Sequence, residues 1–155
     1  MVRGADGEYH TITGNQMGVL LLDYIITARR RKGTLPENAA AISTIVTSKM
    51  VRRICDVNDI HFDETFTGFK FMAEKLAEYQ RDGSYQYVLA FEESYGYMMG
   101  DYVRDKDAVT ACVMITEMAA YYFEQGMTLA QALDALYEKY GFYGERTLNL
   151  VSSRK

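Results

Sequence analysis

Three strand-like runs separated by helical patterns constrain the fold of this chain more than any other feature. Residues 40–47 and 85–91 are rich in apolar and β-branched side chains, and a shorter run covers residues 61–64. The segments between these runs carry apolar residues at helical spacing. Strands that alternate with helices form a largely parallel sheet that is covered on both faces. The sequence therefore predicts an α/β domain with a mixed, largely parallel sheet of about four strands.

Capping signals predict where the helices begin and end. Thr13 with Gln16, and Thr128 with Gln131, have the spacing of a capping box, and Asp107 stands just before a strongly apolar segment. The expected helices cover residues 16–31, 49–57, 68–79, 108–125 and 129–139.

Both ends of the chain resemble strands that have no partner within it. The Asp6-Gly7 pair is a turn signal for a β-hairpin over residues 2–13, and the first arm of this hairpin is very short. Residues 146–151 have the pattern of a last strand. We therefore expect residues 1–155 to be a single domain cut from a longer protein, with short strand remnants at both ends.

Composition restricts the location and the partners of the chain. With 48% hydrophobic and 25% charged residues, it is typical of a globular domain. No apolar run approaches the roughly 20 residues that span a membrane, and the first residues lack a signal peptide.

A net charge of −4 without a basic stripe argues against a nucleic-acid partner. Cys55 and Cys112 do not form a close pair, which favours a cytoplasmic protein. His10 and His61 lack metal-ligand spacing, so no metal site is expected.

The end of the run at residues 85–91 is the strongest candidate for a binding site. Glu92, Glu93 and Ser94 follow it directly, and Gly96 lets the backbone approach a ligand closely. Ligands of α/β proteins lie at the carboxyl ends of strands. Carboxylates beside a hydroxyl suit a polyhydroxylated ligand such as a sugar, whereas the alternative is a solvated turn between strands. By strand alternation Glu93 should point away from Glu92, which predicts a structural role for Glu93.

Three segments resemble one known family. Residues 91–97 (Phe-Glu-Glu-Ser-Tyr-Gly-Tyr), with the charged run at 104–107 (Arg-Asp-Lys-Asp), are similar to the sugar-binding loop of the α-D-phosphohexomutases, the phosphoglucomutase/phosphomannomutase family. Residues 13–21 resemble the helix that opens the third α/β domain of that family, and residues 65–70 resemble the loop before the next helix. The likeness is nearest to the branch of phosphoglucomutases that includes phosphopentomutase-type enzymes.

The resemblance implies one domain of a four-domain enzyme. Enzymes of this family interconvert hexose 1-phosphate and hexose 6-phosphate through a phosphoserine, with Mg²⁺ and glucose 1,6-bisphosphate as cofactors. The Ser-His-Asn-Pro phosphoserine loop and the Asp-Gly-Asp-x-Asp-Arg metal loop of the family do not occur in this sequence. The resemblance therefore implies an isomerase of carbohydrate metabolism as the parent protein. It also implies a fragment that binds no cofactor, contains no catalytic residue and is inactive alone.

The resemblance assigns substrate binding to Glu92, Ser94, Lys106, Thr67 and Gly68. Glu92 and Ser94 would contact adjacent sugar hydroxyls, and Lys106 would contact the phosphate. Thr67 and Gly68 would meet the substrate at the start of a helix. Without the resemblance, Lys106 is an ordinary solvated lysine and Thr67 is an ordinary helix N-cap.

The expected partners are a hexose phosphate and the other domains of the parent chain, with neither a membrane nor a nucleic acid. Arg104 is expected to pair with an acidic side chain, with a contact to the ligand as the alternative. The alternative to the enzyme domain is an autonomous α/β module that binds a metabolite or a protein without catalysis. The strand-like runs disfavour a third possibility, a helical interaction protein.

Overall fold

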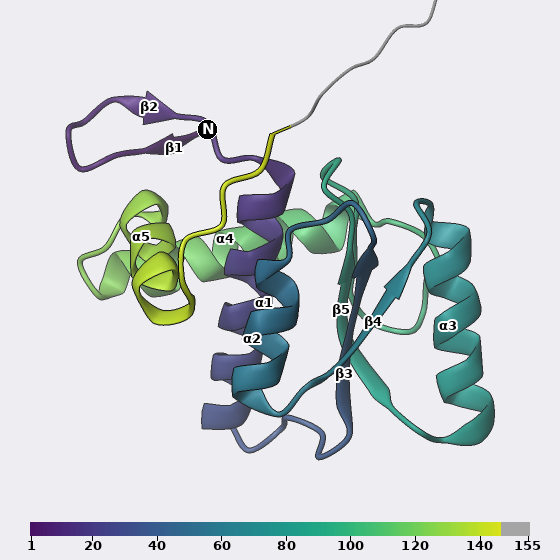
Figure 1. Cartoon of the computed structure of the whole chain (residues 1–155). Coiled ribbons are helices and arrows are strands. Elements are labelled where there is room, and N and C mark those ends of the chain that lie inside the picture. Colours follow the sequence, from purple (N-terminus) through teal and green to yellow (C-terminus); the bar gives the residue numbers. More distant parts are fainter. Residues whose placement is uncertain (147–155) are drawn as a thin grey trace, which may run out of the picture.

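The predicted sheet is present in the computed structural model of the chain, which describes residues 1–146 (Figure 1). Within these residues the main sheet has four strands in the order β4-β3-β5-β6. Strand β3 (Ala39–Thr44) runs parallel to β4 (His61–Thr65) and to β5 (Gln86–Phe91), whereas β6 (Tyr97–Met98) runs antiparallel to β5. The expectation of about four mostly parallel strands is confirmed.

Helices cover both faces of this sheet, as Figure 1 shows. Helix α3 (Phe69–Asp82) packs against one face. The other face carries the larger part of the core and four helices, which are α1 (Gly14–Arg31), α2 (Met50–Asn58), α4 (Ala108–Glu124) and α5 (Leu129–Tyr140).

Strand β3 is buried along its whole length because it lies in the middle of the sheet. Ala40 and Ile42 pack with the residues of α3, whereas Ala39 and Ala41 pack with the residues of the opposite core. This division follows from the two-residue period of a strand. The many small and apolar residues of this run therefore reflect burial on both faces.

Local sequence signals correctly predict how α1, α4 and α5 begin. Thr13 and Gln16 form a capping box at the start of α1, and Thr128 and Gln131 form a second one at the start of α5. The carboxylate of Asp107 accepts a hydrogen bond of 2.9 Å from the Val109 amide at the start of α4. Each contact satisfies a backbone donor that the helix itself leaves free.

The strand expected over residues 40–47 ends earlier, at Thr44. The Thr47 amide donates to the Thr44 carbonyl over 3.0 Å, and the Thr47 hydroxyl accepts from the Thr44 amide over 3.2 Å. These bonds form a turn, which leaves Ile45 and Val46 exposed. The β-branched composition of this segment suits a strand, but the threonine bonds end it.

The segment expected to be a loop, residues 92–106, contains the short strand β6. The Glu92 amide donates to the Gly96 carbonyl over 2.9 Å, so the chain reverses its direction directly after β5. The returning residues Tyr97 and Met98 then pair with Phe91 and Ala90. A strand of two residues is too short to give a period that sequence patterns can detect.

The amino-terminal hairpin is also present but is shorter than expected. Val2–Arg3 (β1) pairs with Tyr9–His10 (β2), and β1 contacts α5 (Figure 1). The strand expected at 146–151 starts at the last described residue and otherwise lies outside the described residues. None of the described helices is both long enough and apolar enough to cross a bilayer.

Candidate functional site

The candidate site lies at the edge of the sheet where β3, β4 and β5 have their carboxyl ends. Three connections leave this edge, at residues 45–49, 66–68 and 92–96. The carboxyl edge of a parallel sheet is the usual place for a ligand in an α/β protein. Thr67 and Gly68 belong to the second of these connections, and Glu92 and Ser94 belong to the third. The fifth expected substrate residue, Lys106, precedes α4.

Glu92 and Gly68 come together at this edge. One carboxylate oxygen of Glu92, Oε1, accepts a hydrogen bond of 2.6 Å from the Gly68 amide. Glu92 is half-buried at the end of β5, and Gly68 stands directly before the first residue of α3. A negative charge at the start of a helix is stabilised by the free amides and by the helix dipole. The contact therefore orients the Glu92 carboxylate.

Thr67 does not act as the N-cap of α3, which was the alternative interpretation of this residue. The residue before the helix is Gly68, whose φ of 114° is favoured by glycine alone, and no side chain of the helix start caps it. The carboxylate of Glu92 supplies the acceptor at this helix start instead. Thr67 is exposed at the same edge of the sheet.

Ser94 lies in the exposed turn between β5 and β6, and two tyrosines attach this turn to the start of α1. The Tyr95 hydroxyl donates to the Ile12 carbonyl over 3.1 Å, and the Tyr97 hydroxyl donates to the Gly14 carbonyl over 3.1 Å. Tyr95 itself has a left-handed backbone with φ of 64°, which is uncommon for a bulky residue. Both bonds restrict the position of Ser94.

Gly96 allows the turn to lie close to α3. A β-carbon added at Gly96 would come within 2.5 Å of the Phe69 ring and within 3.5 Å of Glu92 Oε2. Any larger residue would therefore displace the ring or the carboxylate. This packing requirement explains the glycine that follows the two carboxylates in the sequence.

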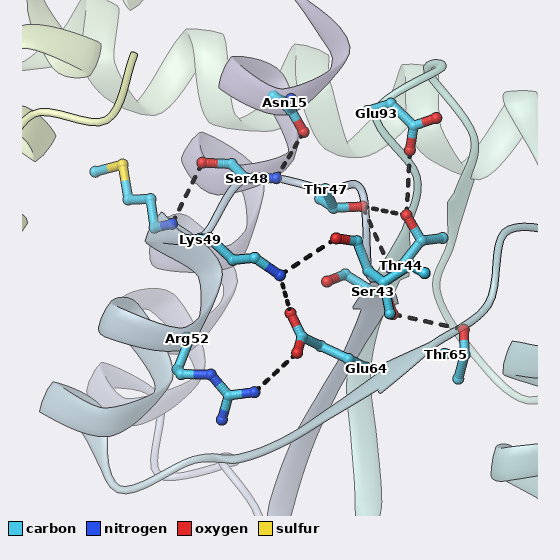
Figure 2. Close-up of polar contacts among 12 residues, drawn as sticks. Asn15, Ser43, Thr44, Thr47, Ser48, Lys49, Arg52, Glu64, Thr65 and Glu93 are labelled. Atoms are coloured by element: carbon cyan, nitrogen blue, oxygen red, sulfur yellow. Dashed lines mark hydrogen bonds and ion pairs between the residues drawn. The ribbon is translucent and has the colours of Figure 1, made fainter. Parts of the chain in front are cut away.

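Glu93 faces a different part of the molecule from Glu92. Its Oε2 accepts a hydrogen bond of 3.2 Å from the buried Thr44 hydroxyl, which also lies 2.8 Å from the Thr47 hydroxyl (Figure 2). The bond joins the connection after β5 to the connection after β3. It supports the structural role that strand alternation predicts for Glu93.

The connection after β3 was not expected to border the site. Beside it, Glu64 accepts 2.6 Å and 3.0 Å contacts from Lys49 and Arg52, respectively (Figure 2). The Lys49 hydrogen bond is the main cause that lowers the pKa of Glu64. In the middle of this group the buried Ser43 hydroxyl has no hydrogen-bond partner within residues 1–146. A run of hydroxyl residues at a strand end is the signal that could have indicated this connection.

Lys106 lies beside the first residue of α3. Its ammonium nitrogen is 5.3 Å from the centre of the Phe69 ring and 3.5 Å from Asp105 Oδ1. Phe69 directly follows Gly68, and the Lys106 side chain is exposed. The neighbouring Asp107 amide donates to the Tyr97 carbonyl over 2.9 Å, which ties this segment to β6.

Within residues 1–146, Arg104 does not pair with an acidic side chain. Its guanidinium donates to the amide oxygen of Gln80 on α3 over 2.7 Å. Since α3 offers a neutral acceptor at this position, the expectation of an acidic partner was wrong. The bond connects the segment before α4 to the helix that begins at the candidate site.

Residues 1–146 do not fit the Mg²⁺ that the resemblance implies for the parent protein. Within residues 1–146 no three His, Cys, Asp or Glu side chains are close enough together to hold a metal ion. Glu92 and Glu93 are adjacent in sequence, but they bond to Gly68 and Thr44 on different connections. The site therefore offers hydrogen-bond acceptors, a hydroxyl and an ammonium group.

Comparison with known proteins identifies the family. The sequence model of the family described as phosphoglucomutase/phosphomannomutase, alpha/beta/alpha domain III, matches residues 13–140. The chain is 36% identical to a phosphopentomutase from Mus musculus over 140 residues, which are 88% of this chain and 22% of that protein. It is 30% identical to a phosphoglucomutase from Staphylococcus saprophyticus over 149 residues, which are 94% of this chain and 26% of that protein.

A solved structure agrees at the level of the fold. A protein from Thermus thermophilus described as a phosphomannomutase superposes with a TM-score of 0.65 at 19% sequence identity, over 83% of this chain and 26% of that one. The chain thus spans about a quarter of the length of such proteins. On the family match and these identities, the chain belongs to the phosphoglucomutase/phosphomannomutase family, of which it is the third α/β domain.

Proposed function

We propose that this domain supplies sugar recognition in an enzyme that interconverts hexose 1-phosphate and hexose 6-phosphate through a phosphoserine. The observation that carries the proposal is the Glu92 carboxylate, which the Gly68 amide orients at the carboxyl edge of the sheet. Membership of a family of phosphomutases supports the class of reaction. What we propose beyond this class is that the substrate is a hexose phosphate, that the reaction uses a phosphoserine, and that single residues have the roles given below.

Glu92 has the hydrogen-bonding capacity that a sugar ring requires. Its Oε1 accepts from Gly68, whereas its Oε2 has no hydrogen-bond partner within residues 1–146. An ionised carboxylate oxygen accepts stronger hydrogen bonds from hydroxyl groups than a neutral acceptor does. Ser94, two residues further along the same turn, adds an exposed hydroxyl that can donate and accept. The two side chains can therefore bind neighbouring hydroxyls of one ring.

Contacts to the middle of the ring suit a mutase. In such a reaction the sugar phosphate has to bind in two orientations, so that each end of the sugar meets the catalytic serine in turn. The central hydroxyls occupy similar positions in both orientations. Glu92 and Ser94 can therefore hold either orientation, because they contact those hydroxyls and not the reacting ends. Their contribution is orientation of the substrate.

Lys106 is the proposed contact for the phosphate group. An exposed ammonium beside a site is free to meet a phosphate as a point charge. Thr67 is exposed directly before Gly68, and the remaining free amides at the start of α3 suit a hydroxyl or an anion. Lys106 and α3 are linked through Phe69, over whose ring the ammonium lies.

The other parts of the reaction are assigned to the rest of the longer protein. The residues described above do not include the serine that carries the phosphate. They also do not include groups that would hold Mg²⁺ or glucose 1,6-bisphosphate. Phosphoryl transfer depends on groups that position and neutralise the phosphoryl group. This chain would supply one wall of the cleft, and the complete protein would be the isomerase.

Mutation of the full-length parent tests the proposal. Replacing Glu92 or Ser94 with Ala should lower kcat/KM while the protein stays folded. For Glu92 the loss of a charged hydrogen bond costs about 1.5–3 kcal/mol, or roughly 10- to 150-fold. Since relatives are described both as phosphopentomutase and as phosphoglucomutase, the assay should use pentose and hexose phosphates. Glu74→Ala, at an exposed glutamate of α3, is the matched control. Unchanged kinetics of a folded Glu92 and Ser94 double variant with both sugars would disprove the assignment.

A further inference from the structure

Helix α4 has a composition that does not match its exposure. Only four of residues 108–124 are neither apolar nor aromatic, namely Thr110, Thr116, Glu117 and Glu124. A helix that is apolar on all sides is normally buried on all sides. In α4, however, only Ala111 and Met118 are buried by the described part of the chain. The sequence of this helix therefore indicates a second covering surface.

The exposed residues form a continuous stripe, here called the outer face of α4. The side chains of Val109, Val113 and Phe123 are exposed by 75%, 59% and 81%, respectively. Three more exposed residues lie between them on the same side of the helix. The outer face thus consists of Val109, Cys112, Val113, Thr116, Ala120 and Phe123.

The spacing of these residues is typical of packing against another helix or apolar surface. From Val109 through Val113, Thr116 and Ala120 to Phe123 the steps alternate between four and three residues. This alternation keeps side chains on one line along a helix and is the pattern of helix-to-helix contacts. Scattered exposed apolar residues need no explanation, but a stripe along a whole helix marks an interaction surface.

The rest of α4 already has partners within the domain. The helix contacts α1, α5 and β6, and Tyr24 of α1 donates a 2.8 Å hydrogen bond to Glu117. At its carboxyl end the outer face borders a groove of about 440 Å³, whose lining includes Val2, Phe123 and Leu129. No residue of the described range 1–146 lies over the outer face, which leaves both the stripe and the groove available to a partner.

The charges of α4 indicate the chemistry of that partner. The helix contains two glutamates, Glu117 and Glu124, and neither lysine nor arginine. A surface that complements it should be apolar in its centre and should carry lysine or arginine at its rim. Since this chain spans about a quarter of the length of its relatives, three quarters of such a protein lie outside it.

We infer that the outer face of α4 is buried against another part of the same longer polypeptide, on a surface with an apolar centre and a basic rim. This interface does not depend on which sugar the enzyme binds, or on whether Glu92 contacts a substrate at all. The inference predicts that α4 forms a permanent contact with another part of the protein, on the side of the sheet opposite to α3.

Cys112 is a natural reporter of this interface because its thiol lies exposed within the outer face. The measurement is the rate at which a maleimide labels Cys112 in the native full-length protein, relative to the rate in the protein unfolded by urea, with each site identified by mass spectrometry. Burial of the outer face should slow native labelling at least tenfold. The buried Cys55 is the internal standard for protection. A native rate within a few-fold of the unfolded rate would overturn the inference.

Dilution distinguishes an intramolecular contact from a second copy of the chain. An intramolecular interface should protect Cys112 equally at all protein concentrations, whereas a dimer interface should lose protection as the protein dissociates. Protection that falls on dilution, together with dissociation seen by sedimentation, would replace the inferred partner with a second copy and so overturn the inference.

Two charge variants test the basic rim. In the full-length protein, Glu124→Lys should expose Cys112 to labelling more than Glu124→Gln does, because a lysine repels a basic rim whereas a glutamine only removes the attraction. Val57→Lys, at a residue of α2 that is 46% exposed, is the matched control and should leave the labelling rate of Cys112 unchanged. Equal protection of Cys112 in both Glu124 variants would contradict the basic rim of the inferred surface.

Discussion

At the scale of single residues, Glu92 serves both the fold and the proposed chemistry. Its Oε1 meets the amide in front of α3, and its Oε2 lies near the position that Gly96 keeps free of a side chain. The carboxylate therefore reaches the site already oriented by a contact within the protein. A group held in this way loses little freedom when a ligand binds, which favours affinity.

Lys106→Met in the full-length enzyme should weaken the binding of a phosphorylated sugar more than the binding of the free sugar. The variant keeps most of the side-chain volume over Phe69 but removes the charge that would meet the phosphate. Affinity for the sugar phosphate should also depend less on ionic strength than in the wild type. Isothermal titration with both ligands at two salt concentrations measures this, and an equal loss for both ligands would assign Lys106 a structural role.

Single residues also show how far the sequence predicts the site. The opposite directions of Glu92 and Glu93 follow from the period of a strand, and the structure agrees. The helix start at Gly68 could not be predicted in this way, because its acceptor is 24 residues further along the chain. Local rules favour the nearest capping residue, Thr67, whereas the folded chain brings a carboxylate from another strand.

At the scale of elements, α5 is attached to the rest of the core by a buried polar network. Asp23 on α1 is only 6% exposed, and it accepts hydrogen bonds from Lys139 at 2.9 Å and from the Tyr140 hydroxyl at 2.5 Å. The same hydroxyl accepts a bond of 3.0 Å from Asn58 on α2. Three helices thus share one tyrosine hydroxyl.

Tyr140→Phe should destabilise the 155-residue chain by about 1–3 kcal/mol, because the buried side chains of Asp23 and Asn58 each lose the hydrogen bond that they make with the Tyr140 hydroxyl. Unfolding in urea, followed by circular dichroism, measures the change. Tyr9→Phe, in the exposed hairpin strand β2, is the matched control and should change stability little. Equal stability of the two variants would show that the network does not stabilise the docking of α5.

Elements with long periodic patterns were predicted well, and elements defined by distant contacts were not. The capping boxes of α1 and α5 are local in sequence, so the starts of both helices were predictable. Strand β6 exists because the turn at Glu92–Gly96 returns the chain along β5, which no local pattern of two residues can indicate. The strand over residues 40–47 was predicted too long, because threonine hydroxyls end it at Thr44.

At the scale of the whole molecule, the chain should lose stability in alkaline solution. Burial, with a contribution from the Glu117 hydrogen bond, raises the pKa of Tyr24 to about 12, and burial raises the pKa of Cys55 to about 12. Burial also raises the pKa of Tyr79, Tyr97 and Tyr122. In the unfolded chain a thiol ionises near pH 8.5 and a phenol near pH 10. The stability that these groups contribute is therefore complete below about pH 8.5 and is lost as the pH rises toward about 12.

Thermal unfolding of the 155-residue chain between pH 8 and pH 12, roughly the range over which these groups ionise, tests this expectation. Tm should decrease as the pH rises, and phenolate absorbance should increase together with unfolding. Tyr24→Phe should show a smaller decrease than the wild type, because it has one ionising group fewer. A constant Tm up to about pH 11 would contradict the raised pKa values.

The 155-residue chain alone should have no mutase activity, even with glucose 1,6-bisphosphate and Mg²⁺ present. One wall of a cleft makes few contacts to offset the translational and rotational entropy that a ligand loses on binding. Sugar phosphate should therefore bind with a Kd on the order of millimolar or weaker. NMR titration should shift amides near Glu92, Ser94, Gly68 and Lys106, and a coupled assay should show no turnover. Micromolar binding elsewhere, or turnover by a pure sample, would favour an autonomous binding module.

The strand order β4-β3-β5-β6 determines when the domain can form during synthesis. The central strand β3 can pair with β4 once that strand has been synthesised, but its second partner, β5, is complete only at Phe91. The segment from there to Tyr140, which contains α4 and α5, follows over a few seconds at roughly 5–20 residues per second. During that interval the sheet and α3 can assemble while the core around Met118 and Leu136 is still incomplete. Thr67, Gly68, Glu92 and Ser94 thus belong to the part of the domain that is synthesised first, and Lys106 and the helices that complete the opposite core are added afterwards.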